Sequence, residues 1–423
     1  MKKVLIITYY WPPSGGAGVQ RWLKFSKYLP EFGWKPVILT VDPNFSSYPQ
    51  IDETLQKEVN SEMLVFRTKS REFYSMYRSI SGNNIPYGGF SNDNKKSPVQ
   101  KLAKIVRGNL FIPDPRRGWI KFAFKKAKEL IKTYDIDTVI TTSPPHSTQL
   151  IGLKLKKKLN IRWIADLRDP WTDIYYYNQF KHTKLALAVD RCYERNVITA
   201  ADMLITVSED LKRIFSTKDK NNRPEKIHVI QNGFDEEDFK TEVKPEAGKK
   251  IITYTGTISE NYDIEGFVNA VNKLEKSIRD KIKIQFIGNV SEIIREKIQR
   301  TETEVEFIGY IPHNEAIENM LKSSMLLLII PNVENNKGIV TGKFFEYLAS
   351  GKPVLAIGPK GGDLETIIAE TNCGKLFNYT EENEISVFIT DYLMENKTLD
   401  TKGSNYSRRA LTERLSMILS NKI

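Results

Sequence analysis

The segment Thr341–Leu355 reads TGKFFEYLASGKPVL and holds a helical pattern followed directly by a strand. Its apolar spacing predicts a helix from Gly342 to Ala349, which ends at the Gly-Lys-Pro turn 351–353. One buried strand is expected before it at Met325–Ile330 and another after it at Val354–Ile357. Strand, helix and strand in this order form the unit of a parallel sheet covered by helices.

The same alternation extends outward through both halves of the chain. In the second half it predicts strands at 251–254, 282–287 and 305–308 and a helix at 264–274. In the first half it predicts strands at 3–8, 36–41, 138–142, 162–165 and 203–207 and helices at 19–29, 119–134, 147–159 and 185–199. The expected fold class is α/β, with two doubly wound, Rossmann-like domains in succession.

Domain limits follow from where the pattern stops and restarts. We expect an N-terminal domain at 1–235, in which 44–118 is an irregular insertion, and a C-terminal domain at 236–400. The last segment, 401–423, carries a helical pattern at 406–419 with no strand after it. A chain of 423 residues exceeds what one hydrophobic core usually supports, which agrees with two domains.

The positive charge is concentrated in the first half. Of the net +11, residues 1–200 contribute +16, from 33 Lys and Arg against 17 Asp and Glu, which leaves −5 for residues 201–423. A one-sided positive field favours an anionic partner such as a membrane surface, a lipid phosphate or nucleic acid. A solubilising surface explains the same charge equally well.

The sequence predicts a cytoplasmic protein. Its longest apolar stretch, 325–330, is far shorter than the ~20 residues that span a bilayer. The apolar start is broken by Thr8 and by Pro12-Pro13 without a cleavage site, so we interpret it as a first strand. Cys192 and Cys373 fit no metal spacing and are expected to be reduced.

One amphipathic segment, Pro98–Phe111, has two interpretations. Val99, Leu102, Ile105, Val106 and Leu110 share one stripe of a helix, and Lys101, Lys104 and Arg107 share another. Such a helix suits a membrane surface. Packing of the apolar stripe against the domain core is equally compatible.

Loops that follow the strands are the expected place for a ligand, because open α/β sheets bind ligands beyond the carboxyl ends of their strands. Gly15, Gly16 and Gly18 after the first strand allow a close approach of backbone to ligand, although a tight turn would use them too. His146 follows a later strand and suits proton transfer or hydroxyl binding, or simple packing. Arg168, near Asp166 and Asp169, suits either a substrate contact or a structural ion pair.

The helix expected at Gly342 offers its free N–H groups and positive dipole end to an anion, which suits a diphosphate leaving group. Glu346 lies about one turn further along this helix, where a carboxylate can accept both hydroxyls of a ribose. The alternative interpretation of Glu346, a surface glutamate on an amphipathic helix, fits the whole segment less well.

On these motifs the chain resembles the retaining GT-B enzymes of glycosyltransferase family 4 over nearly its full length. The resemblance rests on Pro12-Pro13 with Gly15-Gly16-Ala17-Gly18, on Ile230–Asp235, on Tyr254-Thr-Gly256 and above all on Gly342–Val354. It implies two domains that face each other across a cleft, with the donor bound mainly by the C-terminal domain and the acceptor by the other. It also implies that the last helix crosses back to the first domain.

The chain departs from this family at two positions. The first acid of the family's E-x7-E motif falls at Gly338, so amides of 338–340 or Glu334 must replace its contact to the sugar, while Glu346 matches the second acid. The usual Arg and Lys after the first strand of the second domain are absent, since Thr257 follows Gly256 and Tyr262 falls near the Lys position. Lys343 is the first candidate to replace them, followed by Arg21 and Arg168.

The resulting hypothesis is a metal-independent glycosyltransferase with a nucleotide-sugar donor such as a UDP- or GDP-sugar and no other cofactor. Its expected acceptor is a glycan or a polyprenyl-linked sugar, with possible attachment of the first domain to the inner face of the membrane. The candidate residues are, for catalysis, His146, Asp169 and Lys343; for the donor, Gly15, Gly16, Gly256, Thr257, Val340, Thr341, Gly342, Lys343 and Glu346; for the acceptor, Arg21, Arg168 and Arg116.

Two other functions have weaker support in the sequence. A nicotinamide enzyme would need G-x-G-x-x-G at the first helix with an acid about 20 residues on, and the sequence lacks both. A non-catalytic basic protein that binds nucleic acid or another polyanion fits the charge of the first half, but no reader motif is present. Nucleic acid is therefore not an expected partner.

Overall fold

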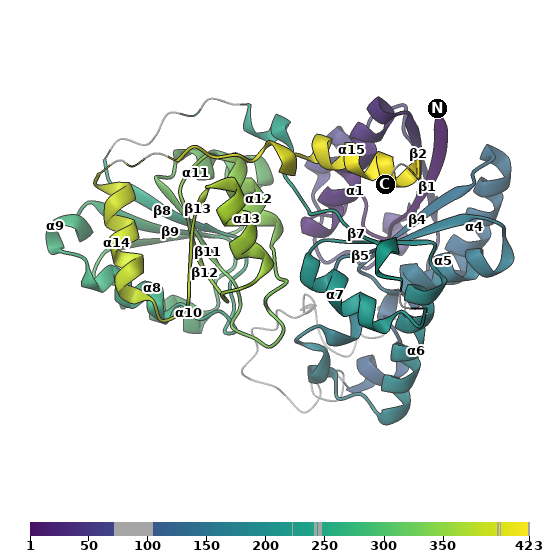
Figure 1. Ribbon diagram of the computed structural model, residues 1–423, viewed down its shortest axis with the longest axis horizontal. Helices are drawn as coiled ribbons and strands as arrows, with labels where there is room; N and C mark the ends of the chain where they lie inside the picture. The colour runs from purple at the N-terminus through teal and green to yellow at the C-terminus, as the bar shows by residue number, and fades with distance from the viewer. Residues whose placement is uncertain are drawn as a thin grey trace. The chain divides into compact units, whose positions relative to one another are not determined.

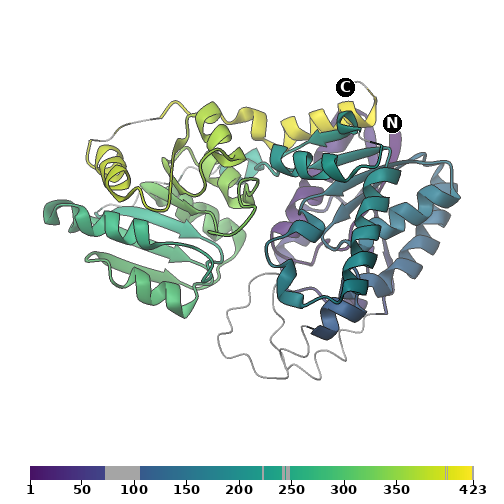
Figure 2. The same ribbon diagram turned by 60° about the horizontal axis from the view of Figure 1, so that its bottom comes forward.

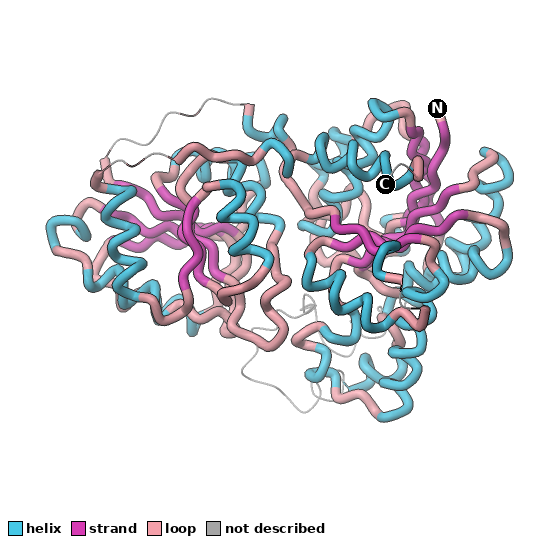
Figure 3. Tube along the Cα trace, in the orientation of Figure 1, coloured by secondary structure: helices cyan, strands magenta, loops and turns pink. Residues whose placement is uncertain are grey.

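A computed structural model describes residues 1–71, 105–221, 223–240, 243, 248–395, 397 and 399–421. They form two compact units, shown in Figures 1 and 3, each built on one parallel sheet with helices on both faces. Unit 1 holds the described residues up to Gln231 and those from Arg408 onward, and unit 2 holds Asn232–Ser407. The chain thus leaves unit 1 four residues before the predicted boundary at 235 and returns seven residues after the predicted boundary at 401.

Unit 1 has a seven-stranded parallel sheet. In spatial order its strands are β3 (Leu64–Thr68), β2 (Trp34–Val41), β1 (Lys2–Ile7), β4 (Thr138–Ser143), β5 (Arg162–Leu167), β6 (Met203–Thr206) and β7 (Ile227–Val229). Its helices are α1 (Ala17–Tyr28), α4 (Ile120–Tyr134), α5 (Ser147–Lys158), α6 (Lys184–Ala200), α7 (Glu209–Lys218) and α15 (Arg408–Leu419).

The alternation of side chains along β1 explains the two helix layers of unit 1. Leu5 and Ile7 pack into the core under α4, α5, α6 and α7, while Val4 and Ile6 pack into the core under α1 and α15. Because successive residues of a strand point to opposite faces, a strand that is apolar at every position must be covered on both sides. All four side chains are fully buried.

Unit 2 repeats this architecture with six parallel strands. In spatial order they are β10 (Glu304–Ile308), β9 (Ile282–Ile287), β8 (Lys250–Thr255), β11 (Met325–Ile329), β12 (Val354–Ile357) and β13 (Gly374–Phe377). The helices are α8 (Glu265–Lys273), α9 (Lys276–Arg279), α10 (Glu292–Ile298), α11 (His313–Lys322), α12 (Gly342–Ala349), α13 (Asp363–Thr371) and α14 (Glu382–Leu393).

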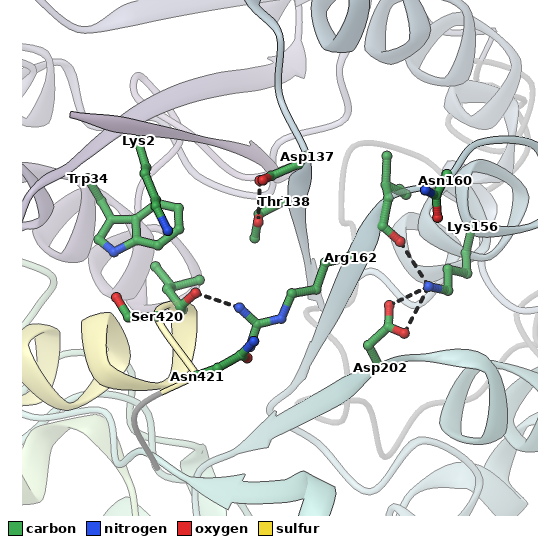
Figure 4. A pocket seen from close by; sticks show the side chains of 12 residues that line it. Lys2, Trp34, Asp137, Thr138, Lys156, Asn160, Arg162, Asp202, Ser420 and Asn421 are labelled. Carbon is green, nitrogen blue, oxygen red and sulfur yellow. Dashed lines mark hydrogen bonds and ion pairs between the residues drawn. The ribbon is translucent and has the colours of Figure 1, made fainter.

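The predicted return of the last helix is confirmed. Helix α15 packs on α1 with Leu411, Leu415 and Ile418 in the core of unit 1. Arg162, at the start of β5, donates to the carbonyl oxygens of Ile418 at 2.7 Å and Leu419 at 2.5 Å. Figure 4 shows Arg162 beside the last residues of α15. A cation at the carboxyl end of a helix complements the helix dipole and its free carbonyl groups.

The pocket drawn in Figure 4 lies beside this contact and has a volume of about 400 Å³. Lys2, Thr138 and Arg162, from the amino ends of β1, β4 and β5, line part of its wall. The predicted ligand loops follow the carboxyl ends of the strands, so this pocket lies at the opposite edge of the sheet.

The prediction that 44–118 is irregular is wrong for part of that range. Residues 64–68 form β3, an edge strand that pairs in parallel with β2. Its side chains are only partly buried, so a short run of three apolar residues was the sole signal for it. Residues 105–110 of the predicted amphipathic segment are helical, whereas 98–104, with Val99, Leu102, Lys101 and Lys104, lie outside the described residues.

Candidate functional site

Lys343 and Gly256 meet at the carboxyl edge of the sheet of unit 2. Gly256 directly follows β8 and has φ of 100°, a backbone conformation that favours glycine. A Cβ placed at Gly256 would lie 2.9 Å from Nζ of Lys343. Glycine is therefore needed at position 256 both for the turn and for the close approach of this lysine.

A hydrogen-bond relay connects Lys343 to the loop after β8. Its Nζ donates to Oη of Tyr254 at 2.8 Å and lies 4.1 Å from the centre of that ring. The Tyr254 hydroxyl donates in turn to the carbonyl oxygen of Thr257 at 3.0 Å. The structure thus brings together three predicted donor residues, Gly256, Thr257 and Lys343, through a tyrosine to which the sequence analysis gave no role.

Burial lowers the pKa of Lys343 to about 7, and the carboxylate of Glu346 opposes this shift. Near neutral pH the amine is consequently poised between its charged and uncharged forms. An anion that binds beside it would favour the ammonium form and raise the pKa again.

Glu346 pairs with a histidine that the sequence analysis missed. Oε1 of Glu346 lies 3.0 Å from Nε2 of His313, the first residue of α11, and each side chain is about a quarter exposed, at 26% and 28%. His313 follows β10 at the same sheet edge as the other loops, and this position was the available signal. The carboxylate therefore stays accessible to a ligand while the imidazole orients it.

The amino end of α12 carries the remaining donor candidates. Thr341 is its N-cap residue, and the buried Thr341 hydroxyl has no hydrogen-bond partner within the described part of the chain. A Cβ at Gly342 would meet no atom within 4 Å, so this helix end is open, and Val340 beside it is buried. Free N–H groups at such an end suit an anion.

In unit 1, two of the predicted ligand residues, Gly15 and Arg21, have partners within the unit. The amide of Gly15 donates to the carbonyl oxygen of Gln50 at 2.9 Å, and a Cβ at Gly15 would lie 3.1 Å from Cβ of Asp52. Gly15 is thus a close-packing glycine. Gly16, with φ of 86°, is the N-cap of α1 and stays a candidate.

Arg21 is the second of these residues and is part of a buried ion pair. Its Nη2 donates to Oδ1 of Asp166 at 3.1 Å and its Nη1 to the carbonyl oxygen of Gln231 at 2.7 Å. Trp22 and Thr142 both donate to Oδ2 of Asp166 at 2.7 Å. Arg21 is 1% exposed, and its ion pair connects α1 to β5 within unit 1.

The other predicted residues of unit 1 lie at the rim. Arg168 is half-buried and donates to the carbonyl oxygens of Ser143 at 2.8 Å and Gly18 at 3.2 Å. Burial raises the pKa of Asp169, and Arg168 opposes the shift. Arg116 donates to the carbonyl oxygen of Ser47 at 3.3 Å.

His146 stacks on an aromatic ring in unit 1. Its ring stacks on Trp171 with centroids 4.4 Å apart and an interplanar angle of 13°. Burial, assisted by the positive charges of Lys218 and Arg168, lowers the pKa of His146 to about 3. The lowered pKa favours the neutral imidazole at pH 7, and a neutral imidazole suits a hydroxyl-binding role.

Asp190 of α6 accepts a hydrogen bond from Trp171, the residue that stacks on His146. The indole N–H of Trp171 donates to Oδ1 of Asp190 at 2.9 Å, and the hydroxyl of Tyr177 donates to Oδ2 at 2.6 Å. Trp171 has φ of 36°, which is rare for a bulky residue. Sequence reasoning missed Asp190 because nothing in a helical pattern shows that an aspartate faces inward.

Two family models match the chain. The model of glycosyltransferase family 4 matches residues 89–238, and that of the glycosyl transferases group 1 matches residues 235–409. The probable glycosyltransferase WbjE of Pseudomonas aeruginosa is 20% identical over 251 residues, or 56% of this chain. The match spans 61% of that relative, less than two thirds of its length.

Solved structures support the same fold. HepE of Anabaena, determined with UDP and glucose, aligns over all of both chains with a TM-score of 0.61 at 15% identity. The lipopolysaccharide outer core galactosyltransferase WaaB also aligns over all of both chains, with a TM-score of 0.58 at 12% identity. Together the two family models span residues 89–409, and the chain therefore belongs to the glycosyltransferases of family 4 and group 1 with the GT-B fold.

Proposed function

We propose that the chain transfers a sugar from a nucleotide-sugar donor to a glycan or lipid-linked acceptor at the cytoplasmic face of the membrane. The observation that carries the proposal is the arrangement around α12, where Lys343 and Glu346 flank a helix end with unused N–H groups. The ammonium of Lys343 and the N–H groups suit a diphosphate, and the carboxylate of Glu346 suits the two hydroxyls of a ribose. A UDP-sugar is the donor we favour, since the HepE structure contains UDP.

We propose further that transfer retains the configuration of the donor sugar and needs no metal. The bond from the anomeric carbon to the diphosphate oxygen breaks as the acceptor oxygen attacks on the same face. The leaving diphosphate oxygen takes the proton of the acceptor hydroxyl. Fixed positive groups at the leaving group assist this step, which assigns to Lys343 the stabilisation of the developing charge.

In unit 1 we assign His146 and Arg168 to the positioning of hydroxyl groups. A neutral imidazole can donate one hydrogen bond and accept one without exchanging a proton. Asp169, Arg116 and Gly16 stay candidates for the same rim.

Thermal stabilisation by a panel of nucleotide sugars tests the donor assignment. A donor at 100 times its dissociation constant adds about 2.7 kcal/mol to the free energy of unfolding. A rise in Tm with one nucleotide series and not with free sugars identifies the donor class. A panel without any stabilising nucleotide sugar contradicts the proposal.

Excess chelator should leave transfer activity unchanged, because the proposed charge stabilisation comes from Lys343 and the helix end. The measurement is the initial rate with and without EDTA, and a chelated sample to which magnesium is restored serves as the control. A fall in the rate that added metal reverses would contradict the metal-independent route.

Glu346→Ala should weaken donor binding about 10- to 100-fold, because a hydrogen bond to a charged group contributes about 1.5–3 kcal/mol. The fold should survive, since the carboxylate is 26% exposed. Calorimetric titration with the donor or UDP measures the effect. Glu384→Ala, at an exposed glutamate of α14 in the same unit, is the matched control. Equal affinity in both variants would remove Glu346 from the site.

A further inference from the structure

Helices α4, α5 and α6 form one continuous layer on the sheet of unit 1, as Figures 1 and 2 show. Their inner sides are apolar and contribute Ala123, Ile151 and Val197 to one core cluster. The outer sides of the three helices face the solvent.

The outer side of this layer is almost purely cationic. Helix α5 exposes Lys154, Lys157 and Lys158 and contains no acidic residue, and α4 exposes four lysines. The one exposed carboxylate on the three helices is Glu129 of α4, which pairs with Lys126 at 2.5 Å. We call the exposed lysines and arginines of α4, α5 and α6 the cationic face.

Helix α6 buries its two acids together with Ala186, Val197 and Ile198, and it exposes a leucine. Lys184, Arg191 and Arg195 are exposed, at spacings of seven and four residues that place them on one side of the helix, and Leu185 is exposed next to Lys184. The two acids of α6 are each 2% exposed: Asp190 accepts from Trp171 and Tyr177, and Glu194 accepts from Lys218 and Thr172.

The charges of the cationic face are not neutralised locally. Within the described ranges, none of the exposed lysines and arginines of the three helices lies within 4.0 Å of a carboxylate oxygen. Repulsion among like charges is a cost to the isolated unit, and an anionic partner relieves it.

Two exposed leucines lie on segments that are hydrogen-bonded to each other at the start of α6. Leu185 is 75% exposed and Leu110 is 65% exposed. The side chain of Asn109 connects their segments, because it donates to the carbonyl oxygen of Lys181 at 3.2 Å and accepts from the amide of Thr183 at 2.6 Å. Lys181 and Thr183 directly precede the first turn of α6.

We propose that the cationic face, with Leu110 and Leu185 at its end, binds the surface of an anionic lipid bilayer. Lysines attract anionic headgroups, and leucines beside them enter the boundary with the acyl chains. The face suits nucleic acid less well, because lysines outnumber arginines and the three helices expose no aromatic ring on which a base could stack. The binding to a bilayer does not depend on the proposed function. Its biological purpose, access to a lipid-linked acceptor, rests on that proposed function.

Co-sedimentation with vesicles tests the inference without any transfer reaction, so its outcome is separate from that of the proposed function. The protein should bind vesicles of phosphatidylcholine that contain about 30% phosphatidylglycerol and should not bind phosphatidylcholine alone. Binding should weaken steeply between about 0.05 M and about 0.5 M salt.

The triple variant Lys154→Glu, Lys184→Glu and Arg191→Glu should lower the affinity for anionic vesicles about 100-fold, since each cation near the surface contributes about fivefold. The matched control is Lys276→Glu, Lys281→Glu and Lys375→Glu, three exposed lysines of unit 2 with the same change in net charge. The control should bind as the unmodified protein does. An equal loss in both triples would overturn the inference.

The pair Leu110→Ser and Leu185→Ser should lower vesicle affinity about tenfold without changing the binding of soluble heparin. Duplex DNA of about 20 base pairs is the competitor that represents the other class of partner. Tighter binding to this DNA than to anionic vesicles would also overturn the inference.

Discussion

Replacing Lys343 with methionine is expected to lower kcat about 100- to 1,000-fold, the usual loss when one group that stabilises developing negative charge is removed. The methylene stem of methionine fills most of the space of the lysine stem, so the packing around Tyr254 is kept. Lys352→Met, at the other lysine of the segment Thr341–Leu355, is the control and should leave the rate unchanged.

The same substitution should remove a pH dependence of UDP binding. The pKa of Lys343 is about 7 in the empty site and should rise when the diphosphate binds. Above pH 7 binding must then take up a proton, so UDP affinity should fall up to about tenfold per pH unit between pH 7.5 and 9. Below pH 7 Lys343 is already charged, so its contribution to the pH dependence of UDP affinity levels off. Calorimetry that finds the same slope in Lys343→Met would exclude this lysine as the titrating group.

Arg21→Met is expected to destabilise unit 1 by about 3–5 kcal/mol, because it leaves the carboxylate of Asp166 buried without its counter-charge. All six tryptophans of the chain, including Trp22 beside this pair, belong to unit 1, so fluorescence during urea unfolding reports on that unit alone.

The control for Arg21 is Arg409→Met. Arg409 pairs with Glu31 at 2.7 Å, but the two side chains are 61% and 40% exposed, and loss of such a pair should cost less than about 1 kcal/mol. Similar unfolding midpoints for both variants would show that the Arg21–Asp166 pair does not stabilise the unit as its burial implies.

The fold could be predicted from the sequence because the buried strands are rich in apolar residues and are separated by helices of ordinary length. The strand and helix of Thr341–Leu355 lie within one residue of their predicted limits. The edge strand β3 was missed, since a half-buried strand of five residues offers little periodicity.

The burial of individual side chains and their contact partners were harder to predict than secondary structure. Nothing in the sequence distinguishes the buried Arg21 from the rim residue Arg168, because both follow glycine loops or strand ends. The same holds for His313, whose partner Glu346 is 33 residues away in the sequence. Such contacts depend on the register of whole elements, which a local pattern does not contain.

The return of α15 to unit 1 also has a consequence for engineering and biosynthesis. Unit 1 is discontinuous, so a ribosome delivers all of unit 2 before Leu411 and Leu415 can close the first core. Exchange of donor domains between relatives must therefore keep residues up to 231 and from 408 onward from the same parent. A single junction near 231 would join a foreign helix to a core shaped for this one.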